Sequence, residues 1–86
     1  MSVEKLNKDG FIEKISNGKG KQVVDFSATW CGPCRMLAPL VSQIAEEKAG
    51  SLYVGKVDVD EQGELAARYG ISSIPCLILF KKKKWL

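Results

Sequence analysis

The chain has 86 residues, which is enough for one small domain spanning 1–86 and too few for a second hydrophobic core. Its formal net charge is +3, but four of the 13 basic residues form the run Lys81 to Lys84, and the ten acidic residues outnumber the other nine. The charge balance therefore does not predict a basic face for nucleic acid, and no aromatic residues are interleaved with the basic ones to stack on bases.

Apolar runs give no sign of membrane insertion or export. Charged residues interrupt the first stretch of the chain, which excludes a signal peptide, and no apolar run is long enough to span a bilayer. Three cysteines is an odd number, which is unremarkable in a reducing compartment. We therefore expect a cytoplasmic protein with no membrane and no nucleic-acid partner.

The first part of the chain predicts an edge strand followed by a helix. Residues 3–6 alternate apolar and polar side chains, which is typical of a short edge strand. Asn7 or Asp9 can cap a helix that ends at the glycine-rich stretch 17–20. The apolar positions expected to share one face of this helix are Phe11, Ile12 and Ile15.

A central strand and a long helix follow. The β-branched run 23–26 predicts a strand covered on both faces, although Asp25 interrupts it. From residue 34 the apolar side chains recur at helical spacing until Ala49-Gly50, with Pro39 inside the helix. Those apolar positions are Leu37, Leu40, Val41, Ile44 and Ala45.

The rest of the chain continues the alternation of strands and helices. Residues 52–59 predict a strand, a short helix begins near Asp60 or Gln62 and closes at Gly70, and 76–80 predict a last strand. The order β-α-β-α-β-α-β favours an α/β fold with a mixed sheet and helices on both of its faces.

The chemistry concentrates in Trp30-Cys31-Gly32-Pro33-Cys34, where the central strand gives way to the long helix. Two intervening residues let the two sulfurs meet, and so short a loop stabilises the fold little, which favours a redox role. A thiolate at Cys31 would face the free N–H groups of the helix, which lowers its pKa. A zinc site usually needs four ligands, and three cysteines without histidine do not supply them, so we expect no metal.

Three stretches of the chain resemble the thioredoxin family. They are 24–36 (Val-Asp-Phe-Ser-Ala-Thr-Trp-Cys-Gly-Pro-Cys-Arg-Met), 56–60 (Lys-Val-Asp-Val-Asp) and 69–75 (Tyr-Gly-Ile-Ser-Ser-Ile-Pro). The resemblance implies a thioredoxin-like α/β fold, a central mixed sheet flanked by helices. In it the strands at Val23 and Leu52 run parallel, and the strand at Cys76 lies antiparallel beside the first. The sequence ends at Leu86, where a thioredoxin would continue into a further strand and helix, so we expect the fold to lack both.

The same resemblance implies the activity. A thioredoxin is a protein disulfide reductase that cycles a dithiol and a disulfide without metal or organic cofactor, and thioredoxin reductase recharges it. The expected functions are therefore electron transport and cell redox homeostasis, with protein disulfides as substrates. The alternative is a shortened, weakly active or inactive thioredoxin fold that serves as a binding module.

Four residues are predicted to be catalytic. Cys31 is the expected nucleophile, and Cys34 the thiol that resolves the mixed disulfide. Burial should raise the pKa of the Asp25 carboxyl and make it a proton acceptor for Cys34, unless Asp25 is only a polar residue at a strand end. Lys56 matches a family lysine that lies near this aspartate, and an exposed strand lysine without a function is an equal alternative.

Five residues are predicted to bind substrate. Trp30 offers an apolar surface beside the thiols, Gly32 lets a substrate backbone approach, and Pro33 stiffens the loop at the helix start. By resemblance, Ile74-Pro75 is a cis-proline loop whose backbone pairs with an extended substrate.

Two further expectations concern the last strand. Cys76 follows the proline where the family commonly has threonine, and it is either a space-filling residue or a regulatory thiol near the active site. Without the family's last strand, residues 77–80 would form an edge with unpaired backbone groups. Such edges attract other strands, which predicts a homodimer.

Overall fold

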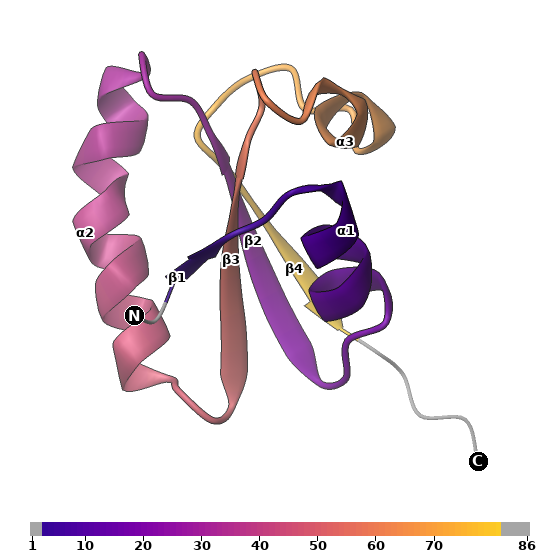
Figure 1. Cartoon of the computed structure of the whole chain (residues 1–86). Helices are drawn as coiled ribbons and strands as arrows, with labels where there is room; N and C mark the ends of the chain where they lie inside the picture. Colours follow the sequence, from indigo (N-terminus) through magenta and orange to yellow (C-terminus); the bar gives the residue numbers. More distant parts are fainter. Residues whose placement is uncertain (1–2, 82–86) are drawn as a thin grey trace.

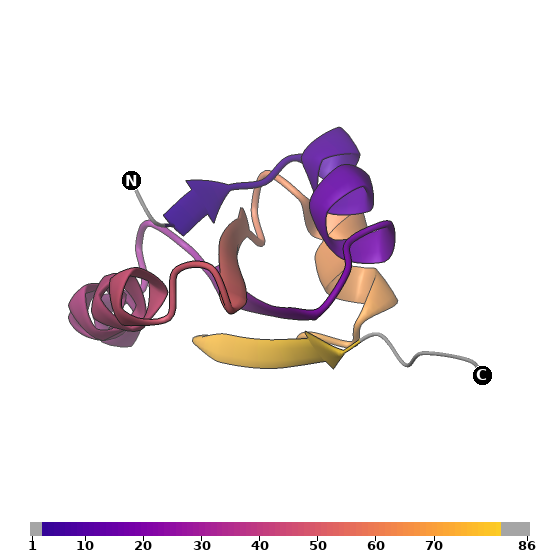
Figure 2. The same cartoon turned by 90° about the horizontal axis from the view of Figure 1, so that it is seen from below.

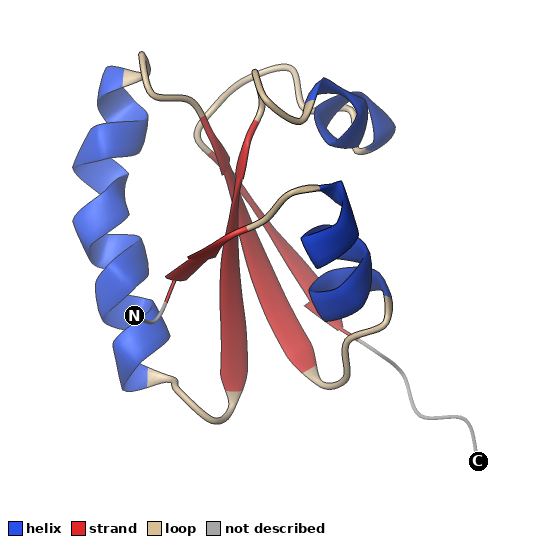
Figure 3. Cartoon of the chain, in the orientation of Figure 1, coloured by secondary structure: helices blue, strands red, loops and turns tan. Residues whose placement is uncertain are grey.

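The structure is a computed structural model that describes residues 3–81 of the chain. Its elements alternate along the chain in the predicted order (Figure 3). They are β1 (Val3–Lys5), α1 (Lys8–Phe11), the π-helix η1 (Ile12–Ser16), β2 (Lys21–Ser27), α2 (Gly32–Glu47), β3 (Leu52–Asp58), α3 (Gly63–Arg68) and β4 (Cys76–Lys81). Lys82 to Leu86, on which the predicted ending of the fold depends, lie outside the described residues.

The four strands form one mixed sheet with the order β1-β3-β2-β4. β3 runs parallel to β1. It also runs parallel to β2, whereas β4 runs antiparallel to β2, as the family resemblance implied. Asp25 in β2 stands opposite Lys56 in β3 on one side and Leu77 in β4 on the other. Strand pairing therefore places the predicted acid and lysine next to each other on the sheet.

Helices cover both faces of the sheet. α2 lies on one side, and α1, η1 and α3 lie on the other (Figures 1 and 2). Val24 and Phe26 of β2 are buried against Phe11, Ile15 and the α3 side. On the opposite face, α2 packs against β3 through a smaller cluster, whose buried members are Val41, Ala45 and Val54.

The first helix differs from its prediction at one position. Asn7 caps α1, because its side-chain oxygen accepts a hydrogen bond from the Gly10 amide at 2.7 Å. Phe11 and Ile15 are buried, but Ile12 is 40% exposed, so the prediction that it shares their face was wrong. One residue is about a quarter turn of helix, so Ile12 points away from the direction that Phe11 and Ile15 share.

The long helix buries only part of its apolar surface. Pro39 lies inside α2, as expected, and Val41 and Ala45 face the core. Leu40 and Ile44 follow the same helical spacing but are exposed. α2 contacts the sheet over β3 and β1, so a second stripe of the helix has no described partner.

Within residues 3–81, no helix is long and apolar enough to cross a membrane.

Candidate active site

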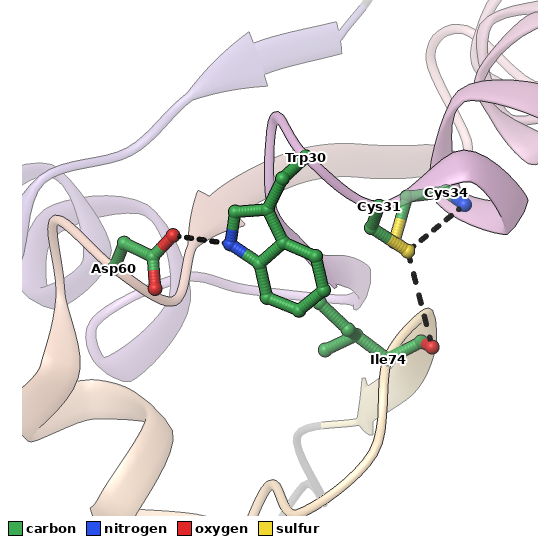
Figure 4. The surroundings of a disulfide bond; sticks show 5 residues. All are labelled: Trp30, Cys31, Cys34, Asp60 and Ile74. Carbon is green, nitrogen blue, oxygen red and sulfur yellow. Dashed lines mark hydrogen bonds between the residues drawn. A yellow bond between two sulfur atoms is a disulfide. The ribbon is translucent and has the colours of Figure 1, made fainter.

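The two cysteines of the C-x-x-C pair lie at the junction of β2 and α2 and form a disulfide with a Cα–Cα distance of 5.2 Å (Figure 4). Both residues are buried and pack with Ala28. The site thus holds the oxidised form of a short-range dithiol pair, at the place the sequence predicted.

The backbone at the start of α2 favours a thiolate at Cys31. Cys31 is the N-cap of the helix, and its Sγ accepts a hydrogen bond from the Cys34 amide at 3.2 Å. Gly32 and Pro33 begin the helix, where proline costs no hydrogen bond. Free N–H groups at a helix N-terminus stabilise negative charge and lower a thiol pKa.

The loop before β4 meets the disulfide from the other side. The peptide bond between Ile74 and Pro75 is cis, as the family resemblance implied. The carbonyl oxygen of Ile74 lies 4.0 Å from Cys31 Sγ, and the Ile74 side chain packs against the cluster around the two cysteines. An extended chain that pairs with Ile74 would therefore run directly beside Cys31 (Figure 4).

Trp30 is held by an acid that the sequence analysis did not single out. Its side chain is 66% exposed, so it is a surface residue rather than part of the core. Its indole Nε1–H donates a hydrogen bond to the Asp60 carboxylate at 2.7 Å (Figure 4). Asp58 shapes the turn that carries Asp60, because its Oδ1 accepts hydrogen bonds from the amides of Asp60 at 2.8 Å and Glu61 at 3.3 Å.

A sequence signal for this contact exists. β2 and β3 are parallel, so their carboxyl ends meet at the same edge of the sheet, and polar residues that follow them come close together. Asp60 follows β3 just as Trp30 follows β2.

Asp25 lies behind the disulfide in a buried position. Its side chain is 3% exposed, and its Oδ1 has no hydrogen-bond partner among the described residues. Burial raises the pKa of the Asp25 carboxyl above its ordinary value, and the positive charge of Lys56 offsets part of the rise. Asp25, Lys56 and Cys34 line one cavity of about 270 Å³. That volume exceeds the space that a water molecule needs.

Cys76 has a free thiol and is half buried. It stands opposite Phe26 in the strand pairing and packs against the main core cluster rather than the cluster around the disulfide. This placement agrees with a space-filling role.

Metal ligands do not gather in the described part of the chain. Between residues 3 and 81, no group of three cysteine, histidine or acidic side chains is arranged to hold a metal ion.

A disulfide at a helix N-terminus, a cis-proline loop beside it and a buried acid behind it define the site of a dithiol–disulfide oxidoreductase. Comparison with known proteins specifies the class. The thioredoxin family model matches residues 2–86. Two similar proteins are the thioredoxins of Pyropia yezoensis, 46% identical, and of Staphylococcus aureus (strain Mu50 / ATCC 700699), 44% identical. Each alignment covers 94% of this chain and 76% of the relative.

A solved structure agrees with these relatives. The chain is similar to chloroplastic thioredoxin z, with a TM-score of 0.88 and 37% identity over 96% of this chain and 74% of the other. The chain therefore belongs to the thioredoxin family. Its fold is thioredoxin-like, and the family together with the Cys31–Cys34 pair makes it a thioredoxin-type protein disulfide reductase.

Proposed function

We propose that Cys31 is the attacking thiolate of the exchange and Cys34 the resolving thiol. Thiolate Cys31 attacks one sulfur of a substrate disulfide, which breaks that bond and leaves one substrate thiolate and a mixed disulfide. Cys34 then attacks the Cys31 sulfur, which releases the second substrate thiolate and forms the Cys31–Cys34 disulfide. The hydrogen bond from the Cys34 amide to Cys31 Sγ carries this assignment, because it stabilises the thiolate before attack.

Asp25 is the proposed proton acceptor for Cys34. Lys56 is the proposed residue that limits the rise in the pKa of the Asp25 carboxyl. A carboxyl with a raised pKa accepts and returns a proton near neutral pH more readily than an ordinary one. The cavity that Asp25 shares with Cys34 gives room for water to relay the proton. Lys56 stands opposite Asp25 on the neighbouring strand and favours the charged carboxylate.

Substrate binds across the surface around Cys31 in this proposal. The backbone at Ile74 and Pro75 pairs with an extended substrate strand, and Gly32 and Pro33 leave the sulfur approachable. The exposed Trp30 ring packs against apolar substrate side chains.

We further propose that the chain works as a single thioredoxin-like domain in the cytoplasm, in electron transport and cell redox homeostasis. Thioredoxin reductase would return the Cys31–Cys34 disulfide to the dithiol. These proposals rest on the family and on the reducing environment that a thiol pair and a further free thiol need.

A second copy of the chain is the proposed partner at the sheet edge. In the described part of the chain, β4 pairs with β2 alone, so its other edge offers unpaired backbone groups. Leu77 and Leu79 project from β4 into solvent rather than into the core. A two-fold axis would join two β4 strands antiparallel and bring these leucines together.

Turbidity of insulin during reduction of its disulfides tests the catalytic roles. Wild type should reduce insulin and Cys31→Ser should not, whereas Cys34→Ser should accumulate a mixed disulfide with insulin that a non-reducing gel separates. Cys76→Ser is the matched control and should retain activity. A stable insulin adduct through Cys34 in the Cys31→Ser variant, with none through Cys31 in Cys34→Ser, would reverse the two roles.

A further inference from the structure

Four exposed lysines lie together at the end of the sheet opposite the disulfide. Lys21 begins β2 and stands directly opposite Lys81, which ends β4. Lys48 follows α2, and its carbonyl accepts a hydrogen bond from the amide of Leu52, the residue opposite Lys21 in the strand pairing. Lys19 precedes β2 in the adjoining turn. Its backbone carbonyl accepts a hydrogen bond from the side chain of Gln22. Figure 1 shows β2 and β3 beginning and α2 ending at this lower end of the molecule. We call these four side chains the basic end.

In the described part of the chain, no ion pair neutralises a lysine of the basic end, although two carboxylates beside Lys48 offset part of its charge. The ion pairs among the described residues involve Lys5, Lys8 and Lys14, and none of them includes a lysine of the basic end. The nearest carboxylates along the chain are Glu46 and Glu47, in the last turn of α2. Like charges opposite each other on paired strands, as at Lys21 and Lys81, oppose folding. An anionic partner would reduce this repulsion, so binding such a partner would stabilise the fold.

The sequence adds to this charge. Lys82, Lys83 and Lys84 follow Lys81 directly in the sequence and lie outside the described residues. On the sequence alone the lysine run was an appendage, and no membrane partner was expected because no segment can span a bilayer. The structure brings Lys19, Lys21 and Lys48, from two other parts of the chain, to the end of the sheet where Lys81 lies. Peripheral attachment to a membrane needs no spanning segment.

We propose that the basic end binds the surface of an anionic lipid bilayer. Clusters of four to eight lysines bind such surfaces, and each lysine near the surface strengthens binding by roughly fivefold. The residue after the run is Trp85, a type that membrane–water interfaces favour. Nucleic acid is disfavoured because binding to single strands needs exposed aromatic rings between the basic residues, and the exposed ring of Trp30 lies at the other end of the molecule.

This orientation leaves the active site free. The disulfide lies where β2 ends, whereas the basic end lies where β2 begins, so the redox end faces away from the bilayer. Asp58 ends β3 at that redox end, Asp60 and Glu61 follow it, and an anionic surface repels these acids. Binding to lipid is therefore independent of disulfide exchange, and an inactive protein would still bind.

Vesicle sedimentation with the full chain at low protein concentration tests the proposal. Wild type should bind vesicles of phosphatidylcholine with phosphatidylserine and should not bind phosphatidylcholine alone, and high salt should release it. The triple variant Lys19→Gln/Lys21→Gln/Lys48→Gln should bind about a hundredfold more weakly. The matched control, Lys5→Gln/Lys8→Gln/Arg68→Gln, has the same change in net charge but keeps the basic end, and it should bind like wild type. Both variants should reduce insulin at the wild-type rate.

Three results would overturn the proposal. The first is equal weakening in the two triple variants, which would mean that only net charge matters. The second is wild-type binding by the basic-end triple variant together with complete loss in Lys82→Gln/Lys83→Gln/Lys84→Gln, which would leave the run acting alone. The third is retention of single-stranded or duplex DNA at a salt concentration where phosphatidylserine vesicles are not bound.

Discussion

Asp25, the proposed proton acceptor, has a cost in stability. The carboxyl is buried with one oxygen unpaired, and a buried polar group without a partner destabilises the fold by about 1–3 kcal/mol. Because burial raises the pKa of Asp25, the folded state ionises it less readily than the unfolded state. The free energy of unfolding therefore falls as pH rises from the ordinary carboxyl pKa through the raised one.

The first prediction follows from this sign. Asp25→Asn should melt at a higher temperature than wild type at pH 8, and the difference should shrink toward zero in acid, where wild type is protonated in both states. For a domain of this size, about 1 kcal/mol corresponds to roughly 4–8 °C. Thermal melts followed by circular dichroism at a series of pH values measure it. A difference that does not change with pH would mean that ionisation of Asp25 is not its cause.

Catalysis should respond in the opposite sense. The Asp25→Asn variant cannot accept the proton of Cys34. Its rate of insulin reduction at neutral pH should therefore fall although its free energy of unfolding rises. The rate should recover as pH rises and the Cys34 thiol ionises without help. Unchanged rates from about pH 6 to 8, on either side of neutral, would defeat the proposed role.

The hydrogen bond between Trp30 and Asp60 gives another prediction at this scale. Asp60→Ala removes the acceptor that orients an otherwise exposed ring, so kcat/KM for insulin should fall by about tenfold, the lower end of the worth of a hydrogen bond to a charged group because this contact is exposed. Asp60→Asn keeps an acceptor and should lose less. Glu61→Ala removes a neighbouring carboxylate and serves as the control. The Nε1–H resonance of Trp30 should move in Asp60→Ala alone, and if it stays in place the contact does not form in solution.

The sequence revealed some of these residues and hid others for physical reasons. Asp25 could be found because an acid inside an apolar strand is unusual, and the cysteine pair because its spacing and its place before a helix are specific. Asp60 was missed, because its place after a parallel strand is a weak signal and its contact with Trp30 depends on a turn built by Asp58. A contact between residues thirty positions apart has no periodicity for a sequence pattern to detect.

At the scale of elements, hydrophobic periodicity predicted which segments are helices but not how much of each helix is covered. The apolar stripe of α2 is wider than the face that β3 and β1 contact, so Leu40 and Ile44 are exposed although they follow the helical pattern. Periodicity records that a residue is apolar, whereas coverage depends on what else packs there. The same limit applied to Ile12 in η1.

Glycines at the two ends of α3 give a matched prediction for this element. Gly70 ends the helix with φ +63°, a conformation that costs other residues roughly 1–2 kcal/mol, so Gly70→Ala should destabilise the protein by about that amount. Gly63 is the first helical residue, has no positive φ, and has open space where a Cβ would lie. Gly63→Ala should therefore be neutral or stabilising by up to about 1 kcal/mol. Urea unfolding measures both, and an equal effect at the two sites would contradict the reason given.

At the scale of the whole molecule, the strand order and directions followed from family resemblance rather than from composition. The alternation of strands and helices predicted a mixed sheet, but only the resemblance placed the strand at Cys76 antiparallel beside the central one. The clustering of lysines at the basic end could not be predicted from the sequence pattern. It depends on the pairing of β2 with β3 and β4, which brings together segments that are far apart in the sequence.

The last prediction concerns self-association through β4. Wild type should sediment as a dimer at high protein concentration and as a monomer at low concentration. High salt should favour the dimer, because it screens the repulsion between lysines at the two edges. Leu77→Lys/Leu79→Lys places charge on the exposed side chains of this edge strand and should remain monomeric. Ile12→Lys makes the same kind of change at an exposed apolar residue on η1, on the other side of the sheet, and should dimerise like wild type. A wild-type protein that stays strictly monomeric at high concentration and melts cooperatively would show that the β4 edge does not pair with a second copy.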